Sequence, residues 1–351
     1  MDAEVATERL RSVDDPRLGD DLVSLGLVND IRVDADTVRI SLALGAPYSP
    51  VETALADMVR DVFAETGYNL ELSAALDRAG PVVDSESADV KNVIAIMSGK
   101  GGVGKSTVAA NTAVTMARRG ARVGLFDADF YGPNLPRMLG VKGVPVGVND
   151  DALFPVRTRG VELMSMGLLT GDDGPVIWRG AMVTDVFTNL WHDISWGTLD
   201  YLIVDLPPGT GDTQLTMLQQ VPVTGAVIVT TPQETALDDA RRGLRLFEEH
   251  NTPVLGIVEN MSGFLCPDCG NEHPIFDADG GQGLAAEFGL PLLGAIPLDP
   301  AIGALGDASD EGDDTDTSPH EAFDAVAANV MDELGEVLRR RHVDRRDESV
   351  V

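Results

Sequence analysis

Lysine is almost absent from this sequence, which contains only Lys91, Lys100, Lys105 and Lys142. Acidic residues outnumber basic residues by 57 to 26, so the formal net charge is −31. This balance excludes a generally basic surface, and we expect no binding to nucleic acid. Scarce lysine together with acidic runs such as 307–316 favours the cytosol of a high-salt organism, where salt screens charge repulsion. An acidic interaction surface in ordinary cytosol is the alternative.

Long hydrophobic runs and cysteines are also scarce. No apolar run is long enough to cross a bilayer, and the N-terminal sequence MDAEVATERL is acidic, unlike a signal peptide. We therefore expect a cytoplasmic protein that does not act at a membrane. The two cysteines, Cys266 and Cys269, cannot form a disulfide framework and need to be explained as a pair.

The most informative stretch is 92–107, where an apolar run of strand character enters a glycine-rich loop and a helical pattern follows. The nucleotide-binding pattern G-x-x-x-x-G-K-[ST] is matched by Gly99, Gly104, Lys105 and Ser106. Backbone N–H groups of such a loop cradle phosphates, with the lysine on the β- and γ-phosphates and the serine hydroxyl on Mg²⁺. We predict a phosphate-binding loop formed by Gly99, Lys100, Gly101, Gly102, Val103, Gly104, Lys105, Ser106 and Thr107.

After residue 92, near-continuous apolar runs predict buried parallel strands between helices, at 122–126, 162–166, 201–204, 226–229, 254–258 and 292–296. Ligands bind beyond the carboxyl ends of such strands. Asp127 and Asp129 follow one run, and Asp205 follows another in the Walker B arrangement. These carboxylates can hold Mg²⁺ through water or orient an attacking water. Helix capping or turn formation is the alternative for Asp127 and Asp129.

The N-terminal part reads as a separate small domain. Its patterns predict a helix at 5–13, strands at 27–33 and 37–44, a helix at 51–66 and a strand at 68–72. The predicted organisation is an α+β domain at 1–80, a linker at 81–91, a P-loop ATPase domain at 92–340 and a polar tail at 341–351.

The cysteine pair has the spacing C-x-x-C, which supplies two of the four thiolates of a tetrahedral site. The chain has no further cysteine, so a complete four-thiolate site needs two chains. A redox pair is disfavoured because Gly270 and Asn271 follow where a helix should start. A Zn²⁺ site within one chain that uses His273 stays open but lacks one ligand, and Zn²⁺ between two chains also stays open.

The loop G-K-G-G-V-G-K-S, with its second lysine Lys100, resembles the deviant Walker A loop of the superfamily that includes ParA, MinD, ArsA and the nitrogenase iron protein. The resemblance implies that two protomers enclose two nucleotides and that Lys100 reaches the partner's phosphates. It also implies a catalytic set of Lys100, Lys105 and Asp129, with Asp127 nearer the metal. Asn260 is implied to contact adenine, although a loop amide that bonds its own backbone is the alternative.

The segments 127–133, 205–212, 231–234 and 266–269, together with this loop, resemble the Mrp/ApbC family over residues 90–300. The segment 15–28 resembles the PaaD-like metal–sulfur cluster assembly domain, but the loop 46–50 lacks the cysteine often found there. The two remaining roles for that domain are docking of partner proteins and structural packing.

The family resemblance implies an α/β, mostly parallel P-loop NTPase that forms a homodimer and uses ATP and Mg²⁺. It further implies a [4Fe–4S] cluster on Cys266 and Cys269 of both protomers, with cluster scaffold proteins and recipient apoproteins as partners. The alternative is a MinD/ParA-type positioning ATPase that acts on membrane or DNA through the apolar stripe at 331–338 and the arginines at 339–341.

Overall fold

The computed structural model describes residues 1–76, 88–130, 132–141, 146–149, 152–170, 180–276, 280–299, 302 and 318–350. The chain divides into two compact units, Met1–Val82 with Met331–Val351, and Val83–Val330. The acidic run 307–316 and most of the predicted linker lie outside the described residues. Within the described part of the chain, no helix is both long and apolar enough to span a bilayer.

The first unit contains α1 (Ala3–Leu10), β1 (Val28–Asp34), β2 (Thr37–Leu42), α2 (Pro50–Ala64) and β3 (Asn69–Ala74). β1 and β2 pair antiparallel across a tight turn at Ala35, whose φ is +46°, and β2 pairs parallel with β3 after the α2 crossover. α2 begins where the Ser49 hydroxyl accepts a hydrogen bond from the Glu52 N–H and Pro50 occupies the first turn. The small α+β domain expected from the sequence is present.

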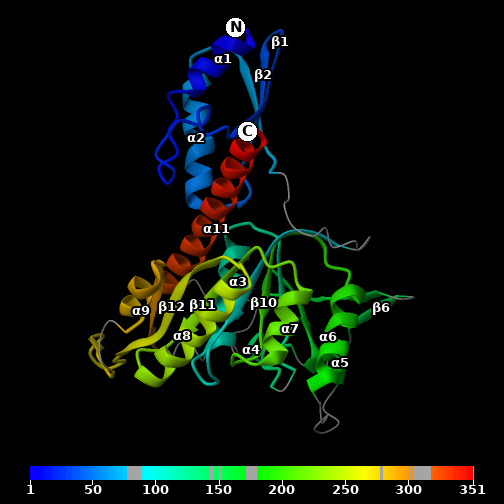
Figure 1. Cartoon of the computed structure of the whole chain (residues 1–351), viewed down its shortest axis with the longest axis vertical. Helices are drawn as coiled ribbons and strands as arrows, with labels where there is room; N and C mark the ends of the chain where they lie inside the picture. The colour runs from blue at the N-terminus through cyan, green and yellow to red at the C-terminus, as the bar shows by residue number, and fades with distance from the viewer. Residues whose placement is uncertain are drawn as a thin grey trace. The chain divides into compact units, whose positions relative to one another are not determined.

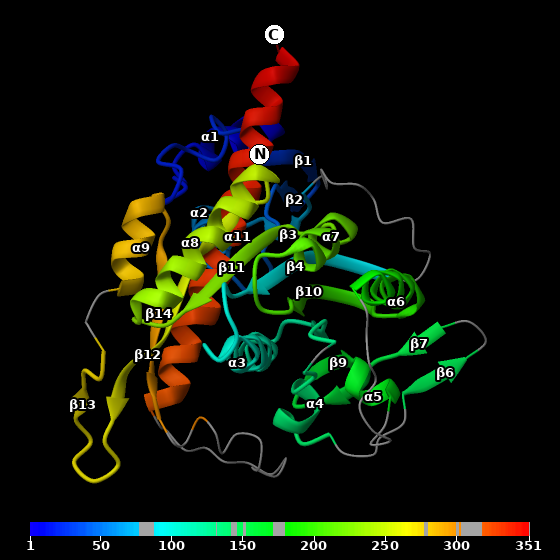
Figure 2. The same cartoon turned by 60° about the horizontal axis from the view of Figure 1, so that its bottom comes forward.

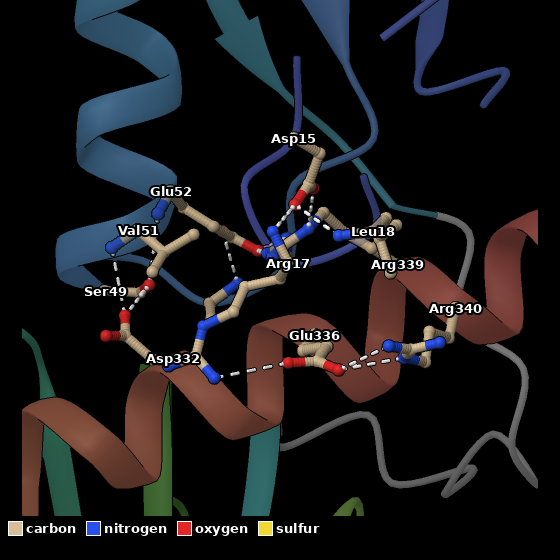
Figure 3. A network of polar contacts seen from close by, with 12 residues as sticks. Asp15, Arg17, Leu18, Ser49, Val51, Glu52, Asp332, Glu336, Arg339 and Arg340 are labelled. Atoms are coloured by element: carbon tan, nitrogen blue, oxygen red, sulfur yellow. Dashed lines mark hydrogen bonds and ion pairs between the residues drawn. The ribbon is translucent and has the colours of Figure 1, made fainter. Parts of the chain in front are cut away.

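The last helix, α11 (Ser318–Val350), contributes its residues from Met331 onward to this first unit. The Arg339 guanidinium is fully buried and contacts Asp15 at 2.8 Å and Glu52 at 2.9 Å (Figure 3). Asp332 accepts hydrogen bonds from the Ser49 hydroxyl at 2.6 Å and the Val51 N–H at 3.0 Å, at the start of α2.

These contacts differ from the predicted boundaries, which placed residues up to 340 in the ATPase domain and a polar tail at 341–351. The structure has helix through residue 350, and residues from Met331 pack with the N-terminal segment because buried carboxylates there neutralise Arg339. Met331 and Leu334 are fully buried. These two residues of the apolar stripe therefore pack within the first unit.

The second unit is built on a sheet in which nine of the described strands join, in the order β13-β12-β11-β4-β10-β5-β9-β8, with β14 also paired to β12. The pairings are parallel except at β12–β13 and β8–β9. The strands are β4 (Ala88–Met97), β5 (Val123–Asp127), β8 (Val156–Thr158), β9 (Val161–Ser165), β10 (Gly197–Asp205), β11 (Gly225–Thr230), β12 (Val254–Leu265), β13 (Glu272–His273) and β14 (Leu292–Leu298). A separate hairpin contains β6 (Gly147–Asn149) and β7 (Ala152–Phe154).

Helices cover both faces of this sheet (Figure 1), and Figure 2 shows α3 on one side with α6 and α7 on the other. They are α3 (Lys105–Arg118), α4 (Leu135–Met138), α5 (Met166–Thr170), α6 (Gly180–Asp193), α7 (Asp212–Gln220), α8 (Glu234–Glu249) and α9 (Gly280–Phe288). Every residue of β5 and β11 is buried, as the near-continuous apolar runs predict. The carboxyl ends of β4, β5 and β10 therefore lie at one edge, where ligands bind in such sheets.

Candidate functional site

The glycine-rich loop connects β4 to α3, and two of its glycines adopt left-handed backbone, with φ of +83° at Gly102 and +85° at Gly104. A Cβ at Gly104 would lie 2.1 Å from the Asn260 amide nitrogen, and one at Gly99 would lie 2.2 Å from the Asp239 carbonyl carbon. Larger residues would collide at both positions. The loop is therefore held by β12 and α8 as well as by its own turn.

Lys105 opens α3 and forms a buried ion pair with Asp205 at the end of β10, with Nζ 2.5 Å from Oδ1. The two side chains are 5% and 0% exposed. The other oxygen, Oδ2, is buried and has no hydrogen-bond partner among the described residues. Burial raises the pKa of Asp205, while Lys105 and Ser106 oppose that rise. The site thus contains the Lys105 ammonium group, the Ser106 hydroxyl and one Asp205 carboxylate oxygen that accepts no hydrogen bond from the described residues.

Asp127, at the end of the neighbouring strand β5, is also buried but has no cation in direct contact among the described residues. Its Oδ2 accepts hydrogen bonds from the Ser165 hydroxyl at 3.0 Å and the Leu135 N–H at 3.2 Å. Burial raises the pKa of Asp127 to about 7, and the negative charge of Asp205 adds to the rise. Asp127 therefore accepts a hydrogen bond from the first residue of α4, which agrees in part with the predicted helix-capping alternative.

A cavity of about 1270 Å³ opens over the phosphate-binding loop. The predicted residues in its wall are Gly101, Gly102, Gly104, Lys105, Ser106, Thr107, Asp129 and Asn260. Asp129 is half-buried there and its N–H donates to Asp127 Oδ1 at 3.3 Å. Gly99, Lys100, Val103, Asp127 and Asp205 are not part of this wall. Lys105, Ser106 and Asp129 are therefore brought together around one opening, with Asp127 and Asp205 behind it.

Lys100 and Asn260 make contacts that the sequence did not predict. Lys100 donates from Nζ to the Thr235 hydroxyl at 3.0 Å, at the start of α8 of its own chain. Asn260 lies within β12, not in a loop after it, and its amide donates to the Val103 carbonyl at 2.8 Å. In this structure the Asn260 amide supports the phosphate-binding loop. Contact of Lys100 with a partner's nucleotide and of Asn260 with adenine stay predictions.

Gln214, which sequence reasoning missed, fixes the loop that follows Asp205. Its amide donates to the Pro208 carbonyl at 2.7 Å, and its carbonyl accepts from the Gly211 N–H at 3.0 Å. Gln214 is the third residue of α7, so the pairing with Gly211 is half of a capping box. The spacing from glycine to glutamine at a helix start was the signal available in the sequence.

The cysteines lie on the turn between β12 and β13, which together form a hairpin (Figure 2). Cys266 is half-buried and Cys269 is exposed. The ligand atoms of Cys266, Cys269 and His273 all lie within 4.8 Å of one another. Backbone N–H groups of Cys269 and Asp268 donate to the Cys266 sulfur and lower its pKa. The turn therefore presents two thiols near a surface, and hydrogen bonds to the Cys266 sulfur lower the pKa of that thiol.

Known protein families match both parts of the chain, the unit with the phosphate-binding loop and the N-terminal segment. Residues 89–332 match the family model described as NUBPL iron-transfer P-loop NTPase, and residues 4–66 match the iron-sulfur cluster assembly protein family. The chain is 46% identical over 308 residues to an iron-sulfur cluster carrier protein of Synechocystis sp., covering 85% of this chain and 87% of that protein. It is 39% identical to one from Salmonella typhimurium, covering 92% of this chain and 89% of the other.

Among solved structures, an Archaeoglobus fulgidus nucleotide-binding protein in complex with ADP is 40% identical, with a TM-score of 0.56. That match covers 62% of this chain and 86% of the other. The Pyrococcus furiosus cell division ATPase MinD, 23% identical with a TM-score of 0.50 over 69% of this chain and 98% of its own, shares the fold. The family match spans most of the chain. The chain belongs to the NUBPL iron-transfer P-loop NTPase family.

Proposed function

We propose that this protein is an ATPase that binds a [4Fe–4S] cluster between two protomers and transfers it to apoproteins. The observation that carries the proposal is the cysteine turn. The only two cysteines of the chain lie together near the surface, in the same unit as a complete phosphate-binding loop. Two thiolates per chain make a four-thiolate site when two chains meet. The iron-sulfur cluster carrier proteins among the relatives support this interpretation.

The residues around the cavity suit a nucleotide with Mg²⁺. The Lys105 ammonium group, which pairs with Asp205 in this structure, is proposed to bind the β- and γ-phosphates. The buried, unpartnered Oδ2 of Asp205 and the Ser106 hydroxyl fit a hydrated Mg²⁺, which would neutralise charge on the phosphates. The loop N–H groups and the start of α3 supply further positive potential.

Hydrolysis needs a group that orients water toward the γ-phosphate. Asp129 is proposed for this role because its side chain lies half-buried in the cavity wall. Lys100 is proposed to leave Thr235 and reach the phosphates of a second protomer, which links nucleotide binding to dimer formation. The loop after Asp205, which Gln214 holds through Pro208 and Gly211, is proposed as the segment through which the nucleotide state would reach the rest of the unit.

The cluster is cargo and not a resident cofactor in this scheme. Scaffold proteins would supply it and apoproteins would receive it, and the N-terminal unit is proposed to dock such partners. The similarity of residues 4–66 to iron-sulfur cluster assembly proteins supports that role. Nothing in the loop 46–50 supplies a thiol, so the N-terminal unit would not ligate the cluster itself.

The test is anaerobic reconstitution of the full chain with Cys266→Ser and Cys269→Ser. Each substitution removes one of two thiolates per chain, and we expect loss of the cluster absorbance and of bound iron and sulfide. Asp268→Asn, which changes the exposed residue between the cysteines, is the matched control and should keep the full load. Retention of the full iron and sulfide load by either serine variant would refute the assignment.

A further inference from the structure

We propose that a single chain also binds one soft divalent ion, such as Zn²⁺, through Cys266, Cys269 and His273, with a fourth position open to solvent. The site uses the cysteines of the proposed cluster site but requires neither the cluster, nor ATP, nor a second protomer. This site includes His273 as a third ligand, and a single chain can therefore bind the ion without a partner.

The distances fit one tetrahedral ion. Cys269 Sγ lies 3.8 Å from His273 Nε2, and all three donor atoms lie within 4.8 Å of one another. Zinc bonds of about 2.3 Å to sulfur and about 2.1 Å to nitrogen place two tetrahedral ligands about 3.6 Å apart. The donors of the unbound chain are therefore close to the positions that one ion requires. Small side-chain rotations would close the remaining difference.

The backbone of the hairpin holds these donors in place. His273 belongs to β13 and pairs with Phe264 of β12, so its position is set by strand pairing. The turn is closed by hydrogen bonds from the Cys266 N–H to the Asn271 carbonyl at 3.0 Å and from the Gly270 N–H to the Cys266 carbonyl at 2.8 Å. Gly270 has a φ of +69°, a conformation that favours glycine. A preorganised turn lowers the entropy lost when the ion binds.

The chemistry of the donors also favours a single ion. Two thiolates balance the charge of a divalent cation, and backbone N–H groups already donate to the Cys266 sulfur. Thiolate and imidazole are ligands that select zinc-class metals over Mg²⁺ or Ca²⁺. Three protein ligands and one open position describe a site that can exchange its metal. Such an ion would occupy the thiols of a free chain and compete with cluster loading.

Cobalt titration of the full chain tests this proposal. Co²⁺ reports thiolate ligation through its charge-transfer absorption and tetrahedral geometry through its visible bands, and Zn²⁺ competition gives the affinity. We expect one ion per chain in wild type, with the oligomer mass measured in the same anaerobic buffer. His273→Ala should weaken Co²⁺ binding at least about 100-fold. Loss of a group that only orients a ligand already costs up to about 100-fold in metal affinity, and loss of a direct ligand should cost at least as much.

His250→Ala is the matched control, because His250 is exposed at the end of α8, and it should bind as wild type does. Wild-type affinity and spectrum in His273→Ala would overturn the proposal, as would one ion per two chains that is insensitive to His273. Circular dichroism and nucleotide binding establish that each variant is folded.

Reconstitution of the same variants separates this inference from the proposed function. A wild-type chain that assembles no cluster but binds Co²⁺ through His273 would overturn only the cluster-carrier proposal. A chain that assembles the cluster while His273→Ala binds Co²⁺ like wild type would overturn only the single-ion site.

Discussion

Two buried carboxylates behind the phosphate-binding loop are stabilised in different ways. Asp205 has an ion pair with Lys105, whereas Asp127 has hydrogen bonds from the neutral Ser165 hydroxyl and the Leu135 N–H. Charge on Asp127 is therefore opposed both by burial and by Asp205, which raises its pKa to about 7. In the nucleotide-free protein, Asp127 gains its charge near neutral pH.

This difference gives stability a predictable pH dependence. The folded pKa of Asp127 lies above the value of about 3.9 in an unfolded chain. Its contribution to stability is therefore complete below about pH 4 and is lost as the pH rises through about 7. Asp127→Asn cannot titrate, yet its amide oxygen can still accept the hydrogen bonds from the Ser165 hydroxyl and the Leu135 N–H. Wild type should lose unfolding free energy relative to the variant between about pH 4 and about pH 7, by up to roughly 1.4 kcal/mol per pH unit.

Denaturant unfolding at constant salt, without nucleotide or Mg²⁺, measures this difference. Parallel pH profiles for wild type and Asp127→Asn would contradict the role assigned to burial. Asp205→Asn is not a suitable substitute, because it would leave the buried Lys105 without its ion-pair partner.

At the scale of helices and strands, most of the second unit could be predicted. Strands buried on both faces produce continuous apolar runs, so the predicted run at 226–229 became β11 and that at 122–126 became β5. The same logic placed Asp127 and Asp205 at strand ends, and the structure shows that these strands are neighbours with the two aspartates in register. The Lys105–Asp205 ion pair was not predicted, because a motif gives the order of residues but not the partners of their side chains.

The C-terminal helix α11 shows why other contacts were missed. The sequence placed Arg339 only among three arginines that could contact membrane or DNA, yet its guanidinium is buried between Asp15 and Glu52. Those partners lie about three hundred residues away along the chain, beyond the reach of local patterns. Ser165 was missed because its partner, the Asp127 carboxylate, lies on another strand. Gln214 contacts Pro208 and Gly211 close by in the sequence, so its capping role could have been predicted from the spacing.

Replacing Arg339 with methionine tests how much α11 stabilises the first unit. Arg339→Met keeps the length of the side chain but leaves the buried Asp15 and Glu52 without a cation. We expect a loss of about 3–5 kcal/mol in the unfolding free energy of this unit. Arg340→Met is the control one residue along the same helix, because Arg340 is exposed and its pair with Glu336 is worth about 0.3–0.5 kcal/mol. Equal effects of the two substitutions would show that the buried network does not hold α11 to the unit.

At the scale of the whole molecule, each chain supplies one phosphate-binding loop and two thiols. A four-thiolate cluster site cannot be completed within one chain, and Lys100, the second lysine of the loop, is proposed to reach the nucleotide of a second protomer. Both features favour a dimer. With a net charge of −31, two chains would repel each other strongly at low ionic strength. Assembly should therefore be measured in molar salt.

The measurement that tests this account most directly is the iron and sulfide content of the reconstituted wild-type chain, together with its mass by light scattering in anaerobic molar potassium chloride. We predict a particle of two chains that holds about four irons and four sulfides. The same load on single chains, or a nucleotide-dependent dimer that holds no iron, would contradict a cluster bridged by Cys266 and Cys269.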